Sequence, residues 1–175
     1  VVRNRERVLP LPVESRPLES LAGAVLAQTV RSERDQPPFD RVTMDGIAFA
    51  SHAWRQGQRR FRIAGIQAAG YPPLNLVDAA DCLEAMTGAV LPQGCDCVVP
   101  AERLRVEDGF AVVDDDTPVE PFLNVHTRGL DAREGDLLLA RGTRLGAPEL
   151  AVLASAGLPR ADVRMEPRIL IAATG

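Results

Sequence analysis

The segment of residues 37–49, PPFDRVTMDGIAF, constrains the fold more than any other part of the chain. Its two opening prolines exclude a regular helix or a central strand, so we expect it to begin as a rigid extended loop. Asp45 and Gly46 then predict a turn, and residues 47–49 predict a strand leading away from it. A carboxylate on a tight turn, beside a glycine that lets a ligand approach, suits a functional site. The alternative is a hairpin turn in which Asp45 caps its own backbone.

The length and composition allow a sizeable buried core. The chain has 175 residues, of which 46% are hydrophobic, and we expect one or two compact units. The net charge is -4 and the positive charges are scattered, which argues against nucleic acid as a partner. All basic residues are arginines, so no lysine of this chain can serve as a base, a nucleophile or a phosphate ligand.

The three cysteines indicate neither a disulfide framework nor a structural zinc site. Their number is odd and no hydrophobic signal segment opens the printed sequence, so we expect a reduced, cytoplasmic protein. Cys95 and Cys97 form a lone C-x-C motif that could contribute to a metal site, but the spacing favours buried, inert thiols. No apolar run approaches the roughly 20 residues that cross a bilayer, so no membrane association is expected.

Frequent glycines and prolines predict a largely β protein. Residues 49–82 are interrupted too often for long helices and favour short strands joined by tight turns. Apolar residues alternate in 104–107 and in 110–112, and the Asp-Gly pair between these segments predicts a hairpin with a two-residue turn. The acidic run 114–116 could bind a cation but is more typical of a solvated loop.

Other regular elements are expected towards both ends of the chain. These are a helix over 18–22, strands over 24–31 and 136–140, a helix over 148–156 and a strand over 169–173. Gly23 is placed to end the first helix, and Gly157 is placed to end the second with a Schellman cap in which Leu158 contacts Leu153. The last strand is apolar throughout, which is typical of a strand buried on both faces, and we expect it to open a further domain.

Two further segments carry groups that could bind a ligand. Thr87 and Gly88 follow an expected strand, where a hydroxyl and a backbone N–H can donate to an anion, although such pairs also end ordinary strands. Residues 124–131 combine Asn, His, Arg, Gly and Asp without a clear period, a density of polar groups that a buried strand would not tolerate. We therefore expect this segment to be a loop beside something polar.

Together these motifs resemble the MoeA family of molybdopterin molybdenumtransferases. The similar segments, in the family's order and spacing, are 38–48, 86–96, 124–131, 142–145 and 169–175. No one of them is specific, but five in order extend the resemblance from about residue 18 to the end of the printed sequence.

The resemblance implies an α+β, mostly β fold. Its parts would be an elongated N-terminal and linker domain, residues 1–28 and 124–166, and an inserted, irregular β-barrel-like domain, residues 29–123. Residues 167–175 would be the first strand of a Rossmann-like, pterin-binding domain that the printed sequence lacks. Because that domain is missing, we expect these 175 residues alone to be inactive.

The resemblance also implies an activity and partners. The family hydrolyses adenylated molybdopterin and inserts molybdenum from molybdate, aided by a divalent cation for which Mg²⁺ is the expected choice. Its members form homodimers in which the β domain of one subunit faces the pterin-binding domain of the other. A molybdopterin-adenylating, MogA-like protein acts upstream.

The family's site residues are carried over by position. Asp45, Thr87 and Asp131 match catalytic positions, and Asp45 and Asp131 could also hold the cation. Either aspartate could instead simply cap a turn. The matched substrate-binding positions are Gly46, Gly88, Asn124 and Arg128.

Four positions depart from the family pattern. Ile47 stands where an aromatic residue is usual, His126 and Thr127 where arginines are common, and Leu130 where an acid is usual. Two functions therefore remain open. The chain is the N-terminal part of a molybdenum insertase, or it is a non-catalytic MoeA-like binding or scaffolding module.

Overall fold

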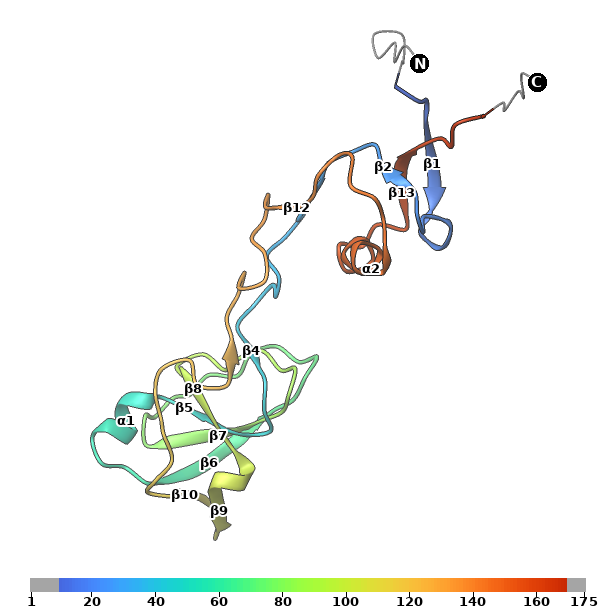
Figure 1. Ribbon diagram of the computed structural model, residues 1–175. Helices are drawn as coiled ribbons and strands as arrows, with labels where there is room; N and C mark the ends of the chain where they lie inside the picture. The colour runs from blue at the N-terminus through green and yellow to red at the C-terminus, as the bar shows by residue number, and fades with distance from the viewer. Residues whose placement is uncertain (1–9, 170–175) are drawn as a thin grey trace, which may run out of the picture. The chain divides into compact units, whose positions relative to one another are not determined.

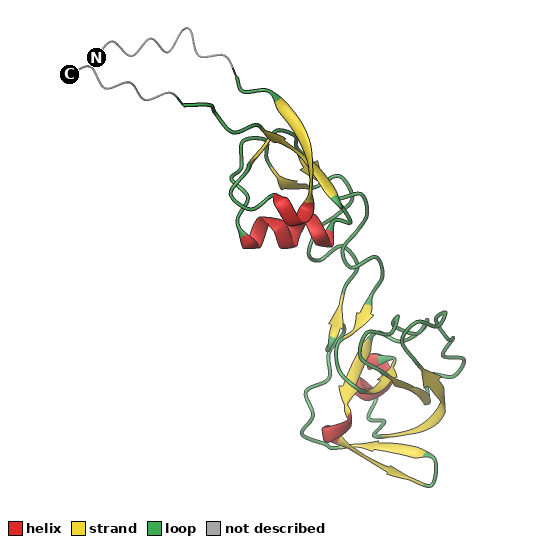
Figure 2. Cartoon of the chain, turned by 90° about the vertical axis from the view of Figure 1, so that its right-hand side faces the viewer, coloured by secondary structure: helices red, strands yellow, loops and turns green. Residues whose placement is uncertain are grey.

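The computed structural model describes residues 10–169, which form two compact units. Unit 1 consists of the described residues of Val1–Glu33 and Glu134–Gly175, and unit 2 is Arg34–Arg133. Both units are built mainly of strands, with few and short helices (Figures 1 and 2). This division places 29–33 in unit 1 and 124–133 in unit 2, whereas the domains expected from the sequence meet at 28/29 and 123/124.

Unit 1 is a small antiparallel sheet packed against one helix. The sheet has the order β1-β13-β2, and β3 pairs separately with β12. Leu21, Leu26, Leu145, Leu153 and Val163 are fully buried at its centre. The elements are β1 Val13–Pro17, the 3-10 helix η2 Leu18–Ser20, β2 Val25–Leu26, β3 Val30–Arg31, β12 Leu137–Leu139, α2 Ala147–Ser155 and β13 Arg160–Arg164.

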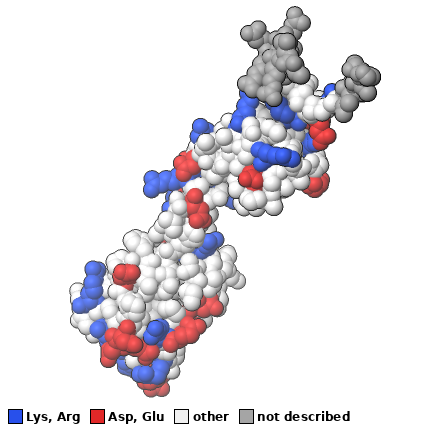
Figure 3. Space-filling view, in the orientation of Figure 1, with Lys and Arg blue, Asp and Glu red and all other residues white. Residues whose placement is uncertain are grey.

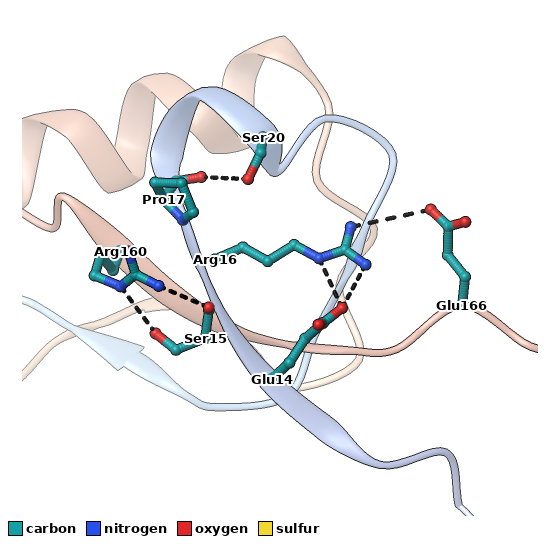
Figure 4. A network of polar contacts seen from close by, with 7 residues as sticks. All are labelled: Glu14, Ser15, Arg16, Pro17, Ser20, Arg160 and Glu166. Atoms are coloured by element: carbon teal, nitrogen blue, oxygen red, sulfur yellow. Dashed lines mark hydrogen bonds and ion pairs between the residues drawn. The ribbon is translucent and has the colours of Figure 1, made fainter.

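The longest ladder of unit 1 joins β1 to β13, from Val13 opposite Arg164 to Pro17 opposite Arg160. Arg160 reaches across this ladder and donates to the Ser15 carbonyl at 2.8 Å, while Arg16 donates to Glu14 on its own strand at 2.8 Å (Figure 4). The local sequence predicts neither strand, because prolines surround β1 and charged residues alternate with small ones in β13. Only pairing between the two ends of the chain makes them strands.

The C-terminal end of α2 confirms the predicted Schellman cap. The Gly157 N–H donates to the Ala154 carbonyl at 2.9 Å, and the Leu158 N–H donates to the Leu153 carbonyl at 3.0 Å. Gly157 has a φ of 74°, in the left-handed region. At the other end, Glu149 accepts a hydrogen bond from the Gly146 N–H at 2.8 Å. The helix starts and ends one residue before the predicted 148–156.

Unit 2 is a six-stranded, curled sheet of half-barrel form, with strand order β8-β5-β7-β6-β10-β9 (Figures 1 and 2). β6 and β7 are parallel, and the other neighbouring strands are antiparallel. β4 and β11 form a separate pair. The elements are β4 Arg41–Val42, β5 Gly46–Phe49, α1 Ser51–Arg55, β6 Arg60–Gln67, β7 Asp81–Ala85, β8 Cys97–Pro100, η3 Ala101–Arg103, β9 Leu104–Glu107, β10 Phe110–Val113 and β11 Val125–His126.

Both faces of the central strands of unit 2 are buried. Ile47 and Phe49 of β5 point into one apolar cluster, where Phe49 stacks on Phe61 with ring centroids 4.3 Å apart. Ala48, between them, belongs to a second cluster on the other face, as the two-residue period of a strand requires. The three cysteines are free and buried, as predicted, and burial raises the pKa of Cys82 and Cys95 to about 12.

The local predictions for unit 2 are confirmed where the turn chemistry is strong. β9 and β10 form the expected hairpin, with Asp108 at a φ of 51° and Gly109 at 78°, as a two-residue hairpin turn requires. The strand predicted over 47–49 is present as β5 and begins one residue earlier, at Gly46, which was predicted to belong to the turn. The acidic run 114–116 lies in a loop whose side chains pair with Arg59, Arg103 and Arg105.

Several other predictions need correction. The helix expected over 18–22 is only the 3-10 turn η2. The strand expected over 24–31 is two strands, because β2 pairs with β13 while β3 pairs with β12. A helix, α1, lies in the region 49–82 that the sequence analysis expected to contain strands and turns. The strand expected over 169–173 lies almost wholly outside the described residues.

Candidate functional site

Three chain segments meet at one end of the unit 2 sheet, where β6 and β7 finish and β5 begins. β6 and β7 run parallel with Gln67 opposite Ala85, so both strands end at the same edge. β5 is antiparallel to β7, and its first residue, Gly46, also pairs with Ala85. Asp45, which precedes β5, therefore lies beside residues 86–88, which follow β7. The sheet thus joins two motifs that are distant in the sequence.

Thr87 holds the Asp45 carboxylate through two hydrogen bonds to one oxygen. The Thr87 N–H donates to Asp45 Oδ1 at 2.7 Å, and the Thr87 hydroxyl donates to the same oxygen at 2.8 Å. These bonds favour the charged form and lower the pKa of Asp45 below the ordinary aspartate value. Thr87 uses both donors on Asp45, so neither serves an oxyanion while the pair is intact. The pair presents a negative charge to solvent.

Gly46 and Gly88 shape the backbone around this pair. A Cβ at Gly46 would lie 2.0 Å from the Val99 carbonyl oxygen, so β8 approaches β5 too closely for any side chain. Gly88 has a φ of 86°, and its N–H donates to the Val42 carbonyl at 2.9 Å. These backbone roles explain both glycines, and their expected part in substrate binding stays a prediction.

A pocket of about 330 Å³ lies next to Asp45. η3 connects β8 to β9, the two outermost strands of the sheet, and residues of η3 and β9 form part of the pocket wall. Its lining is mainly apolar, and it includes Asp45, Glu84, Met86, Ala101, Leu104 and Val106. The sequence predicts the hairpin but gives neither its residues nor Glu84 a place in a site. The sequence feature that could have pointed to the hairpin is its alternating apolar face. In the structure this face is not fully covered, since Val106 is 59% exposed.

Asn124 ties the predicted loop 124–131 to the sheet and to the segment before Asp45. Its side-chain amide donates to the Val98 carbonyl at 2.9 Å, and its own carbonyl accepts from the Thr43 N–H at 3.1 Å. Its φ of 52° is in the left-handed region, which asparagine tolerates better than most residues. Apart from the two-residue strand β11, the segment is the loop that the sequence predicts.

The other polar residues of this loop pair with the segment 35–41. Arg128 donates from Nε to Asp35 at 2.6 Å and from its backbone N–H to Asp40 at 2.8 Å. His126 Nδ1 lies 3.1 Å from a guanidinium nitrogen of Arg41, and Nε2 lies 3.0 Å from Asp131 Oδ1. Because arginine can only donate, Nδ1 accepts and Nε2 donates to Asp131.

The seven predicted site residues thus fall into two sets. Asp45, Gly46, Thr87 and Gly88 form one continuous site. Asn124, Arg128 and Asp131 lie on the loop 124–131, in which Asn124 contacts Val98 and Thr43 while Arg128 and Asp131 contact the 35–41 segment. Within residues 10–169, no group of three or more His, Cys, Asp or Glu side chains is placed to hold a metal ion.

The surface charge and the length of the helices are relevant to nucleic acids and membranes as partners. Basic and acidic side chains are interspersed on the face of each unit shown in Figure 3, without a continuous basic stripe. Among residues 10–169, no helix has the length and apolar composition needed to span a membrane.

Comparison with known proteins relates both units to one family. Residues 2–157 match the family model of the MoeA N-terminal region (domain I and II). A molybdopterin molybdenumtransferase of Synechocystis sp. is 40% identical over 153 residues, which are 87% of this chain and 39% of that protein. One of Staphylococcus aureus is 30% identical over 170 residues, which are 94% of this chain and 40% of that protein.

Solved structures agree with the sequence comparison. The crystal structure of the molybdopterin biosynthesis MoeA protein from Pyrococcus horikoshii OT3 is similar with a TM-score of 0.80 and 28% sequence identity, covering 89% of this chain and 42% of that chain. The present chain therefore spans about 40% of the length of the relatives it matches. It belongs to the MoeA family, and its two units correspond to the N-terminal region of that family.

Proposed function

We propose that this chain is the N-terminal part of a molybdopterin molybdenumtransferase, which in its complete form inserts molybdenum from molybdate into adenylated molybdopterin. The names of the relatives support this assignment. The single observation that carries it is the Asp45–Thr87 pair, in which an exposed carboxylate is held ready at the edge of a pocket. A charged group that is exposed beside a pocket is available to a ligand bound there.

We propose that Asp45 supplies one carboxylate oxygen to a divalent cation, with Mg²⁺ the expected ion. Its Oδ1 is occupied by Thr87, while Oδ2 makes no hydrogen bond to any described residue. Mg²⁺ commonly takes one or two protein carboxylates and completes its octahedron with water and substrate phosphates, so a group of three protein ligands is not required. When bound, the cation would neutralise charge on the phosphates and on molybdate.

Asp131 and Arg128 have proposed roles at the second set of residues. Asp131 would provide the other carboxylate near the cation, oriented by His126. Arg128, whose side chain is 65% exposed and whose Nε is held by Asp35, would bind an anionic group of the substrate with its remaining guanidinium donors. Gly46, Gly88 and Asn124 would contribute backbone shape to the substrate site.

The whole protein is proposed to act as a homodimer in the cytoplasm, downstream of a molybdopterin-adenylating, MogA-like protein. The family relationship supports the pathway, and three free, buried cysteines suit a reducing compartment. Because the chain spans only about 40% of its relatives, we expect these 175 residues alone to show no molybdenum insertion.

The test is molybdate-dependent turnover of adenylated molybdopterin by the complete protein that carries this chain. Asp45→Asn should lower kcat/KM roughly a hundredfold, as does loss of one preorganised charge-stabilising group in other enzymes. Asp45→Asn combined with Asp131→Asn should remove most of the remaining activity. Asp115→Asn is the matched control, because Asp115 is 91% exposed and, among the described residues, pairs with Arg59 alone. Unchanged insertion in the double variant would refute the assignment of these carboxylates.

The second candidate is a non-catalytic MoeA-like binding or scaffolding module. One observation favours it: Asp131 is paired with His126, at a position where the family commonly has arginine. The same assay separates the two functions. Under the scaffolding alternative, the unaltered complete protein folds but does not convert adenylated molybdopterin at any molybdate concentration.

A further inference from the structure

A buried glutamine lies at the same end of the unit 2 sheet as the Asp45–Thr87 pair. Gln67, the last residue of β6, is only 1% exposed. Its Oε1 accepts from the Leu74 N–H at 2.7 Å, and its Nε2 donates towards the carbonyls of Ala68 at 3.3 Å, Pro72 at 3.3 Å and Tyr71 at 3.5 Å. One side chain therefore fixes the loop 68–74 from the inside, using both its donor and its acceptor capacity.

The same residue is also connected to the turn after β7. The Met86 N–H donates to the Gln67 carbonyl at 3.1 Å, and Met86 precedes the threonine that holds Asp45. The loop fixed by Gln67 lies close to that turn, because a Cβ at Gly88 would be 3.9 Å from the Ala69 side chain. The Gln67 carbonyl thus links the end of β6 to the turn, and the Gln67 side-chain amide donates to the carbonyl of the next peptide, Ala68–Ala69, where the loop begins.

We propose that Gln67 is a positioning residue for the active site, fixing the loop 68–74 and with it the turn 86–88 from which Thr87 holds Asp45. This inference rests on the proposed function, because it explains the buried Gln67 amide by the need to keep the Asp45–Thr87 site in place. Gln67 does not line the pocket beside Asp45, so its effect passes through the turn rather than through contact with a ligand.

A half-buried glutamine at the other end of these two strands provides a control. Gln58 lies just before β6, at the opposite end of the parallel pair, and its Nε2 donates to the Arg60 carbonyl at 3.0 Å and to the Ala80 carbonyl at 2.8 Å. It therefore bridges the starts of β6 and β7, while Gln67 acts where they end. A loss of stability of the strand pair should follow from changing either residue, whereas a loss of site geometry should follow from changing Gln67 alone.

The experiment compares Gln67→Met with Gln58→Met in the complete protein. Gln67→Met should accelerate amide hydrogen exchange of residues 86–88 by about tenfold or more and lower kcat by a factor of roughly 10 to 100, because small misplacements of site groups are costly. Gln58→Met should leave both quantities within about twofold of the unaltered protein. If Gln67→Met does not fold, Gln67→Glu takes its place, because it keeps the acceptor for the Leu74 N–H.

The outcomes separate this proposal from the proposed function. Equal exchange at 86–88 and equal kcat in the two variants would overturn the positioning role, whatever their common loss of thermal stability. Absence of activity in the unaltered complete protein would refute the proposed function, while the exchange measurement would still decide whether Gln67 fixes the turn.

Discussion

Two aspartates of unit 2 hold hydroxyl residues through similar contacts but in different ways. Asp96 accepts from the Ser51 N–H at 2.6 Å with one carboxylate oxygen and from the Ser51 hydroxyl at 2.7 Å with the other, so both oxygens serve to start α1. Asp45 accepts both bonds from Thr87 with Oδ1 alone. The difference leaves Asp45 with a second oxygen that can act on a ligand, and Asp96 with a purely structural task.

The charged state of Asp45 gives a prediction for the pH dependence of this pair. Hydrogen bonds from the Thr87 N–H and hydroxyl lower the pKa of Asp45. The stabilisation that these bonds give is therefore complete at any pH above the ordinary pKa of aspartate. They should weaken only as the pH falls through the lower pKa of the folded state. The Thr87 amide proton, followed by NMR during an acid titration, should report this transition below the usual aspartate range. Thr87→Val, which removes the hydroxyl donor, should raise the midpoint; an ordinary midpoint in the unaltered chain would contradict the prediction.

Among the secondary-structure elements, the parallel pair β6–β7 decides where the site forms. Two antiparallel strands that are joined by a hairpin finish at opposite ends of a sheet. If β6 and β7 were joined in this way, Gln67 and Met86 would be far apart. The long connection from β6 to β7 allows the parallel arrangement and places both strand ends beside Asp45. Elements that are fixed by local chemistry have a supporting part. The β9–β10 hairpin lines one side of the pocket in unit 2, and α2 completes the core of unit 1.

The helix cap at Gly157 is a stability prediction at this scale. A Cβ at Gly157 meets no atom within 4 Å, so a substitution there tests the left-handed backbone conformation alone. Gly157→Ala should lower the free energy of unfolding by about 1 kcal/mol, measured by urea denaturation. Gly157→Asn should cost less, because asparagine tolerates this conformation. Equal stability of the glycine and alanine proteins would show that the cap does not stabilise α2.

Across the whole molecule, most of the architecture depends on contacts between distant parts of the sequence. Unit 1 is assembled from both ends of the chain, with β1 paired to β13, and unit 2 is formed by the sequence between them. In unit 2, residues from β5, β6, β7, β8 and β10 meet in one apolar cluster that also contains Cys82 and Cys97. The cysteines are therefore part of the packing of unit 2.

This packing predicts that the thiols are unreactive in the folded protein. Burial raises the pKa of Cys82 and Cys95 to about 12 and raises that of Cys97 as well, so the nucleophilic thiolate is scarce at about pH 8. A disulfide reagent such as Ellman's reagent should modify none of the three cysteines before unfolding and all of them after it. Rapid reaction of even one thiol under native conditions would mean that unit 2 opens readily.

The sequence by itself determined those features whose causes lie within a few neighbouring residues. The Asp-Gly turn specifies the β9–β10 hairpin because both central residues must adopt positive φ, and Gly157 ends α2 for the same reason. The motifs 44–46 and 86–88 were also visible, together with their order along the chain.

Only the tertiary structure decided which distant partners satisfy each group. The local pattern at 24–31 predicts one strand, but pairing with β13 and β12 divides it in two. Ser51 begins a helix because Asp96 reaches it from beyond β7, and Asp45 is held by Thr87 rather than by its own turn. Backbone and carboxylate groups must be paired wherever the fold places them, and the identity of the partner depends on strand order and register, which neighbouring residues do not encode.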